Sequence, residues 1–168
     1  MRKQTGFTLI ELIIVIVILG ILAVTAAPRF INLQGDARAS TLQGVAAALQ
    51  GGSQLVFAKA AINGVQATNT SNDLDIDNDG TADLTIINGY PNANPNLGAL
   101  DVELAEWVDL DIELSTVANP TSAFILTADT NLFTITLNGT AAGEDCEVVY
   151  TNADEGEAPN IAVTDTGC

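Results

Sequence analysis

The hydrophobic and polar positions divide this chain into an apolar rod followed by a more polar remainder. Between Phe7 and Ala27 the only ionisable side chain is Glu11, and most of the other residues are aliphatic. As an α-helix that rises about 1.5 Å per residue, this stretch reaches about 31 Å, the thickness of a bilayer core. The sequence therefore predicts a membrane-length helix over residues 7–28.

The helical pattern continues beyond Pro28. Apolar residues recur at helical intervals with polar residues between them: Phe30, Leu33, Ala37, Val45, Leu49 and Val56. Three glycines oppose a helix by about 1 kcal/mol each unless something packs closely against them: Gly44, Gly51 and Gly52. Asn63 and Gly64 form a helix stop. We therefore predict one long helix over residues 7–62.

The second half of the chain has a β pattern. Short β-branched and aromatic runs at 84–87, 124–126, 133–137, 148–150 and 161–163 predict strands, separated by turns such as Asn138-Gly139 and Glu155-Gly156. Residues 88–96 are predicted to be loop, and 97–108 fit a helix face although 108–114 alternates like a strand. These elements predict an α+β fold, in which a long amino-terminal α-helix packs against an antiparallel β-sheet.

Charge and composition exclude several functions. The formal net charge is −16, histidine is absent, and Arg29, Arg38 and Lys59 are the only basic residues after Lys3. A nucleic-acid interface needs a basic face, so it is not expected. Acid–base catalysis would have to use carboxylates, and these are so abundant that no pair stands out. We therefore predict no catalytic residues and no enzymatic activity.

One acidic stretch resembles the opening of a calcium-binding loop. Asp75, Asp77 and Asp79 alternate and are followed by Gly80, as in loops that bind calcium through carboxylate oxygens. Ile86 stands where the bidentate glutamate would fall, so Asp83 is the candidate substitute. The predicted ligands are Asp75, Asp77, Asp79 and Asp83. An exposed acidic turn without a metal explains the same residues equally well, and no cofactor is required.

The amino terminus resembles that of a type IV pilin. Met1 to Gly6 form a short basic leader, which is followed by Phe-Thr-Leu-Ile-Glu-Leu and the long aliphatic helix. In that family a prepilin peptidase cuts after the glycine, here Gly6, and methylates the new amino terminus, here Phe7. The resemblance divides the chain into a leader (1–6), a transmembrane and filament-core helix (7–28), and a globular head (29–168).

The resemblance also gives roles to single residues. Glu11 is the family's assembly glutamate, which pairs with the amino terminus of a neighbouring subunit. Gly20 and Pro28 fall where the family's helix loosens or bends. Physical chemistry agrees for Glu11, because an unpaired carboxylate in hydrocarbon costs roughly 2.5 kcal/mol or more and a nearby amine removes that cost. A signal anchor that happens to carry one carboxylate is the simpler alternative.

The chain has two cysteines, Cys146 and Cys168, which are candidates for a disulfide. An even count in an exported chain favours a disulfide, and the family's carboxy-terminal disulfide-bounded region resembles residues 146–168. Closing a loop of about 23 residues contributes roughly 3 kcal/mol on the chain-entropy model. A catalytic or metal-binding cysteine pair is the weaker alternative.

The resemblance implies a structural function. Residues 13–42 look most like the mannose-sensitive haemagglutinin pilins, which implies a helical homopolymer for surface attachment, with surface carbohydrate as a possible target. Implied partners are the inner membrane, the prepilin peptidase and the pilus assembly machinery. The implied location is the inner membrane as precursor and then an extracellular fimbrium on a Gram-negative cell.

Two alternatives remain open at this point. A pseudopilin of a type II secretion system shares the amino-terminal motif; major pseudopilins generally rely on calcium, so the cysteine pair argues against this alternative and the acidic loop favours it. The other alternative is an anchored, non-polymerising module that binds a ligand through calcium.

Overall fold

The computed structural model describes residues 7–94, 99–140 and 145–168, with the backbone alone for residues 27–32. The chain divides into two compact units, Met1–Ala37 and Arg38–Cys168, and we call the second the head unit. The helix α1 spans Leu9–Ile62, close to the predicted 7–62, and supplies residues to both units.

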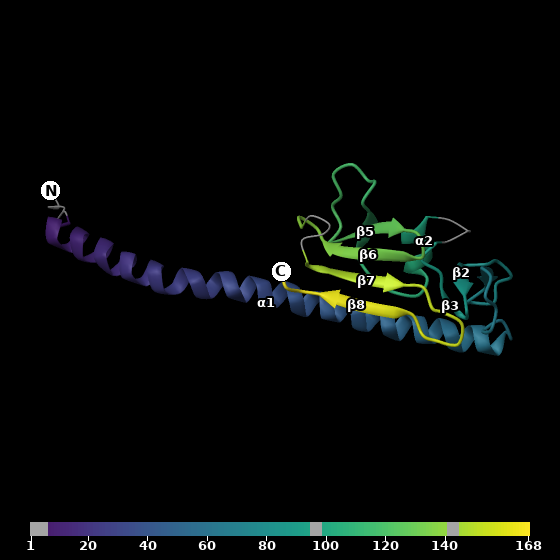
Figure 1. Cartoon of the computed structure of the whole chain (residues 1–168). Coiled ribbons are helices and arrows are strands. Elements are labelled where there is room, and N and C mark those ends of the chain that lie inside the picture. The colour runs from purple at the N-terminus through teal and green to yellow at the C-terminus, as the bar shows by residue number, and fades with distance from the viewer. Residues whose placement is uncertain (1–6, 95–98, 141–144) are drawn as a thin grey trace. The chain divides into compact units, whose positions relative to one another are not determined.

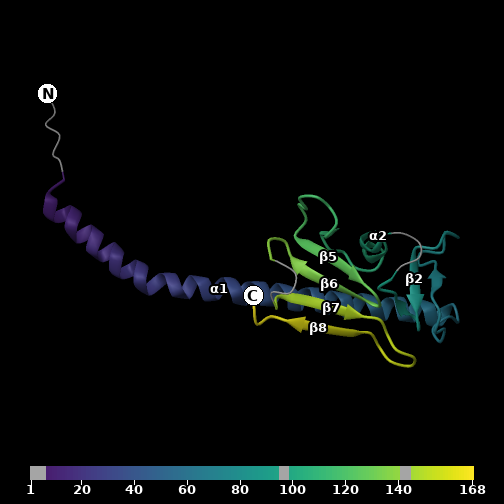
Figure 2. The same cartoon turned by 45° about the horizontal axis from the view of Figure 1, so that its top comes forward.

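Two sheets build the head unit. The smaller one has the order β1-β2-β3, from Asn72–Leu74, Leu84–Ile87 and Tyr90–Pro91, and all its pairings are antiparallel. The larger one has the order β4-β5-β6-β7-β8. Its strands are Ile112–Leu114, Phe124–Asp129, Leu132–Leu137, Glu147–Thr151 and Asn160–Thr164. Figure 2 shows β5 to β8 lying side by side in that order.

The predicted α+β class is confirmed, and two details differ from the prediction. Strands β5 to β8 pair antiparallel, but β4 joins the edge of β5 in parallel, with Ile112 opposite Phe124. The segment 88–91, predicted to be loop, instead forms a tight hairpin turn at Asn88-Gly89 and the short strand β3. Both central residues have positive φ, 52° and 84°, as the mirror-image hairpin turns require. The ambiguous segment resolves into the helix α2, Leu100–Ala105.

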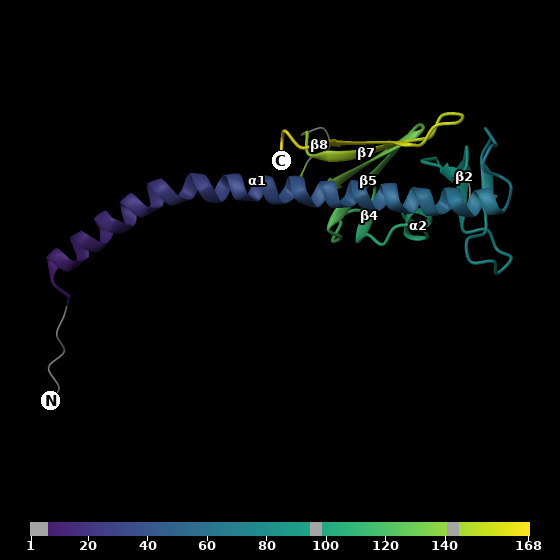
Figure 3. The same ribbon diagram turned by 90° about the horizontal axis from the view of Figure 1, so that it is seen from below.

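The head part of α1 carries one buried stripe. Leu42, Val45 and Leu49 pack with Phe133, Tyr150 and other inward residues of the larger sheet. Two and three turns farther along, Val56 and Ala60 pack against Leu74, Leu84 and Ile86 of the smaller sheet. Figures 1 and 3 show this part of the helix running along one face of the strands. A single helical stripe therefore organises both cores.

Glycine allows the closest contact of that stripe. A Cβ on Gly52 would lie 2.5 Å from the backbone oxygen of Trp107 and 2.8 Å from its ring. Trp107 follows α2 and packs, half-buried, against both cores, as expected of a core tryptophan. Gly52 thus lets α1 and the segment after α2 approach within contact distance.

Candidate functional site

The amino-terminal segment begins its helix with a capping box. The Thr8 backbone N–H donates to Glu11 Oε2 at 2.8 Å, and the Glu11 backbone N–H donates to Thr8 Oγ1 at 3.3 Å. The Thr8 hydroxyl also donates to Glu11 Oε2, at 2.9 Å. This reciprocal pairing of a threonine with a glutamate three residues later satisfies donors that a helix end leaves open. The sequence contains this Thr-x-x-Glu signal, although the family resemblance pointed only to an intermolecular role for Glu11.

The capped helix exposes an apolar surface on all sides. Between Leu9 and Val24 every large aliphatic side chain is at least half exposed, from 50% for Val15 to 77% for Val24. Leu9–Ala26 is long and apolar enough to cross a membrane, and none of it is buried within the chain. Leu33–Ile62 passes the same test of length and composition, but a third of it is buried. The first segment therefore has apolar surface that this chain alone does not cover.

The other predicted residues of this segment lie as follows. Phe7 precedes the helix and is 93% exposed, whereas Gly6 lies outside the described residues. The α-helix continues without a break through Gly20 and Pro28. Pro28 has no N–H to donate to the preceding turn, and a Cβ on Gly20 would meet no other group. The helix shows no interruption at either position, and loosening there stays a prediction.

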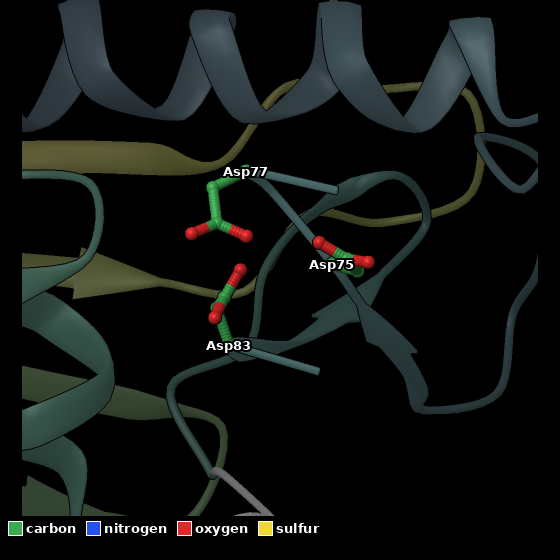
Figure 4. A group of neighbouring side chains, drawn as sticks. All are labelled: Asp75, Asp77 and Asp83. Carbon is green, nitrogen blue, oxygen red and sulfur yellow. The ribbon is translucent and has the colours of Figure 1, made fainter. Parts of the chain in front are cut away.

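The acidic loop brings three of its four predicted ligands together. Asp75, Asp77 and Asp83 each place one carboxylate oxygen within 4.8 Å of the others. Figure 4 shows the carboxylates of Asp77 and Asp83 facing one another with Asp75 beside them. Hard cations such as calcium take carboxylate oxygens of this kind. The arrangement fits a small oxygen-ligated cation, although three carboxylates alone leave most of its coordination positions to other groups.

Backbone hydrogen bonds fix the acidic loop. Asp75 accepts from the N–H groups of Asn78 and Gly80, at 2.6 and 3.0 Å, and Asp83 accepts from the N–H of Ile76 at 2.7 Å. Gly80 has a φ of +93°, which supports the turn predicted there. Asp79 is not part of the carboxylate group, and its Oδ1 accepts from the Thr81 N–H at 2.7 Å.

The predicted disulfide is present. Cys146 and Cys168 are joined with a Cα–Cα distance of 4.8 Å and a sequence separation of 22. Cys146 is buried and directly precedes β7, and the N–H of Gly167 donates to the backbone oxygen of Asp145 at 2.9 Å. The bond therefore ties the end of the chain to the entrance of β7.

Comparison with known proteins concerns the amino-terminal segment. Residues 1–27 match the family described as the prokaryotic N-terminal methylation motif. The chain is 50% identical over 48 residues to the type IV narrow pilus major component of Thermus thermophilus. The matched stretch covers 29% of this chain and 41% of that protein. It is 44% identical over 52 residues to the type II secretion system core protein G of Pseudomonas aeruginosa, covering 29% and 37% respectively.

The similarity has clear limits along the chain. The matched part spans only about two fifths of the length of these relatives, and no solved structure matches the chain. Residues 1–27 therefore carry a methylation motif, and the chain is similar in part to a type IV pilus component and to a type II secretion system core protein.

Proposed function

We propose that this chain is a structural subunit of a type IV pilus, stored in the inner membrane and polymerised into an extracellular filament. The observation that carries the proposal is the capped apolar helix Leu9–Ala26, none of which is buried within the chain, behind a methylation motif. A helix that is apolar on every side needs apolar surroundings on every side. Lipid supplies them before assembly, and helices of other copies supply them within a filament.

Glu11 has two roles in this proposal. Its Oε2 caps the helix through Thr8, while its negative charge pairs with the amino terminus of Phe7 on a neighbouring copy after cleavage at Gly6. Both hydrogen bonds from Thr8 reach the same carboxylate oxygen, and Oε1 takes part in neither. The charge pair is favourable because the alternative is an uncompensated carboxylate in an apolar environment, at a cost of roughly 2.5 kcal/mol or more.

Three variants separate capping from charge pairing. Glu11→Gln keeps a capping-box side chain but removes the charge, Thr8→Ala removes the hydroxyl part of the cap but keeps the charge, and Glu11→Ala removes both the capping side chain of residue 11 and its charge. We expect sheared surface filaments to be lost in both Glu11 variants and retained in Thr8→Ala. Mass spectrometry of the mature chain should show loss of residues 1–6 and one added methyl group. Normal filaments in Glu11→Gln would show that the charge has no part in assembly.

Surface attachment is the finer part of the proposal. The resemblance of residues 13–42 to the mannose-sensitive haemagglutinin pilins supports it, with surface carbohydrate as a candidate target. A strain that lacks this chain should lose both its fibres and its adherence to a surface. Adherence that persists without the fibres would leave a structural subunit with another task.

A pseudopilin of a type II secretion system is the second candidate. It is supported by the similarity to core protein G and by the carboxylate cluster of the acidic loop. The disulfide favours the pilus instead. Dependence of enzyme secretion on this chain, with no surface fibres containing it, would favour the pseudopilin.

We also propose that the acidic loop binds calcium. The convergence of Asp75, Asp77 and Asp83 supports this proposal, and Asp79 supplies a matched control. Calcium should raise the urea midpoint of the wild-type chain and of Asp79→Asn, but not that of Asp77→Asn. Equal urea midpoints of the wild-type chain with calcium and with a chelator would show that the loop is an acidic turn without a metal. They would also exclude the calcium-dependent binding module.

A further inference from the structure

Three asparagines of this chain are followed directly by glycine: Asn63, Asn88 and Asn138. Such a glycine leaves its backbone nitrogen open to the side-chain amide before it, because it has no side chain of its own to block the approach. Attack of that nitrogen on the asparagine Cγ closes a five-membered imide ring and destroys the asparagine. The sequence gives the three sites equal standing, whereas the structure separates them.

The amide of Asn138 is held on the turn between β6 and β7. Its Nδ2 donates to the backbone oxygens of Pro120 and Ser122, at 3.1 and 2.8 Å. Its backbone N–H donates to the backbone oxygen of Ala123 at 2.9 Å. The Asn138 Cγ can swing toward the next nitrogen only after the two hydrogen bonds of its own amide break, so this site is protected although it is exposed.

The amide of Asn88 is held in a different way. Its Nδ2 donates to the backbone oxygen of Ala153 at 2.8 Å. Gly89 is buried, and a Cβ there would lie 2.8 Å from the Phe57 ring. The turn therefore has little room to rearrange into an imide ring, and this site is protected by packing as well as by a hydrogen bond.

Asn63 has neither kind of protection. Both Asn63 and Gly64 are exposed, and a Cβ on Gly64 would meet no atom within 4 Å. Among the described residues, no hydrogen bond holds the side-chain amide of Asn63. The N–H of Gly64, the attacking nitrogen, donates to the backbone oxygen of Ala61 at 3.2 Å. This long hydrogen bond closes the last turn of a helix, where helices fray.

That last turn also ends α1 in a defined way. Gly64 has a φ of +74°, and the N–H of Val65 donates to the backbone oxygen of Ala60 at 2.9 Å. Together with the hydrogen bond from Gly64 to Ala61, these features make a Schellman motif. Val65 packs against the core that Ala60 and Val56 share with the smaller sheet. The peptide bond between residues 63 and 64 therefore lies inside the motif that stops α1.

We propose that Asn63 is the asparagine at which the folded chain deamidates first, and that isoaspartate at this position opens the end of α1. The Gly64 nitrogen gives its proton to solvent hydroxide and forms a bond to Asn63 Cγ. The bond from Cγ to Nδ2 breaks, and that nitrogen leaves as ammonia after taking a proton from water. Water then opens the imide at either carbonyl, which yields aspartate or isoaspartate. Nothing is oxidised or reduced, and filament formation has no part in the reaction.

Isoaspartate changes the backbone as well as the charge. Its main chain runs through Cβ and Cγ, so one additional carbon separates residue 63 from Gly64. The N–H groups of Gly64 and Val65 are then displaced from the carbonyls of Ala61 and Ala60. Ordinary aspartate adds only a negative charge, which is mildly unfavourable at the carboxyl end of a helix.

The rates are measured on the full-length chain in an uncharged detergent at mildly alkaline pH. Mass spectrometry of digests follows each asparagine, because exchange of –NH2 for –OH changes the peptide mass. We expect Asn63 to react about tenfold or more faster than Asn88 and Asn138, as the hydrogen bonds at those two sites require. In urea, which removes the fold, the three rates should become similar. Asn63→Gln should abolish the fast reaction, since its amide carbon is one bond farther away, and leave the other two rates unchanged.

Three outcomes would overturn the ranking. Equal rates in the folded chain would show that the hydrogen bonds of Asn88 and Asn138 do not protect them. A slower reaction at Asn63 than at either of the others would show that the last turn of α1 stays closed. The same order of rates in urea would assign that order to the neighbouring residues rather than to the fold.

Amide hydrogen exchange tests the effect on α1. The fraction that contains isoaspartate, separated after ageing, is compared with Asn63→Asp, which carries the charge without the additional backbone carbon. We expect exchange at Gly64 and Val65 to be about tenfold faster in the aged fraction, because each loses one hydrogen bond, and nearly unchanged in Asn63→Asp. Equal exchange in the aged and the unmodified chain would show that the end of α1 tolerates the modification.

Discussion

Replacing Tyr150 by phenylalanine tests how the two sheets of the head unit are joined. Tyr150 lies on β7 and is fully buried, and its ring stacks on Phe133 with centroids 4.7 Å apart. Its hydroxyl donates to the backbone oxygen of Pro91 in β3 at 2.8 Å. Phenylalanine keeps the stacked ring and removes only this donor. The buried oxygen of Pro91 then loses its partner, so we expect the free energy of unfolding to fall by about 1–2 kcal/mol at neutral pH.

The same substitution changes how stability depends on pH. Burial, and to a smaller extent the neighbouring Tyr90, raises the pKa of Tyr150 above its usual value of 10.0. The folded chain therefore keeps a proton that the unfolded chain releases above about pH 10. This contribution is complete below pH 10 and is lost as the pH rises further, by about 1.4 kcal/mol at one pH unit above that value. Tyr150→Phe lacks this loss, so the two stabilities should become nearly equal near pH 11.

The assay is urea unfolding of the full-length chain in an uncharged detergent, with the disulfide intact. Trp107 is the only tryptophan, and its ring centroid lies 5.9 Å from that of Tyr150, so its emission reports on this part of the core. Tyr90→Phe is the control, since Tyr90 is half-buried and its ring keeps the stack on Phe57. We expect the control to keep the fall in stability above pH 10, because Tyr150 and its hydrogen bond to Pro91 are unchanged.

A constant difference between wild type and Tyr150→Phe from pH 8 to pH 11 would refute this reasoning. It would mean that the phenol ionises as readily in the folded chain as in the unfolded one. An unchanged stability at neutral pH would show instead that water replaces the lost donor to Pro91.

Two further predictions use the same assay. Gly52→Ala should lower the free energy of unfolding by about 1–3 kcal/mol, because its Cβ would overlap Trp107. Gly51→Ala meets open space and should raise the free energy of unfolding by up to about 1 kcal/mol. Equal effects of the two substitutions would show that Gly52 does not lie on the buried face of α1. Replacing Cys146 and Cys168 by serine should lower the free energy of unfolding by about 3 kcal/mol, and a reductant should have the same effect on the wild type. An unchanged urea midpoint in both cases would show that the disulfide does not restrain the unfolded chain.

The elements with a repeated pattern were predictable from the sequence. The helix was expected over 7–62 and is found at Leu9–Ile62, since both its apolar pattern and its stop signal are local. Val45, Leu49 and Val56 are buried as expected. Leu33, which the same pattern selected, is 60% exposed and belongs to the amino-terminal unit.

The rest depended on contacts between distant residues. Strands β1 and β3 have three and two residues, too few to show an alternation, and they exist because β2 pairs with both. The parallel pairing of β4 is likewise a property of how the chain returns to the sheet. In the acidic loop the spacing suggested four ligands, and the structure brings three of them together without Asp79.

The two parts of α1 differ in what covers their apolar side chains. From Leu42 onward the buried residues follow a single stripe, and the two sheets of the head unit cover it completely enough that Leu42 and Leu49 are 0% exposed. Between Leu9 and Val24 the aliphatic residues occupy every side, and each of the large ones is at least half exposed. The only charged side chain in that stretch is Glu11, whose carboxylate caps the helix through Thr8. The proposed function supplies both an apolar environment for this helix and a partner for its carboxylate. Under that proposal lipid provides the first before assembly, and a second copy with a free amino terminus provides both within the filament.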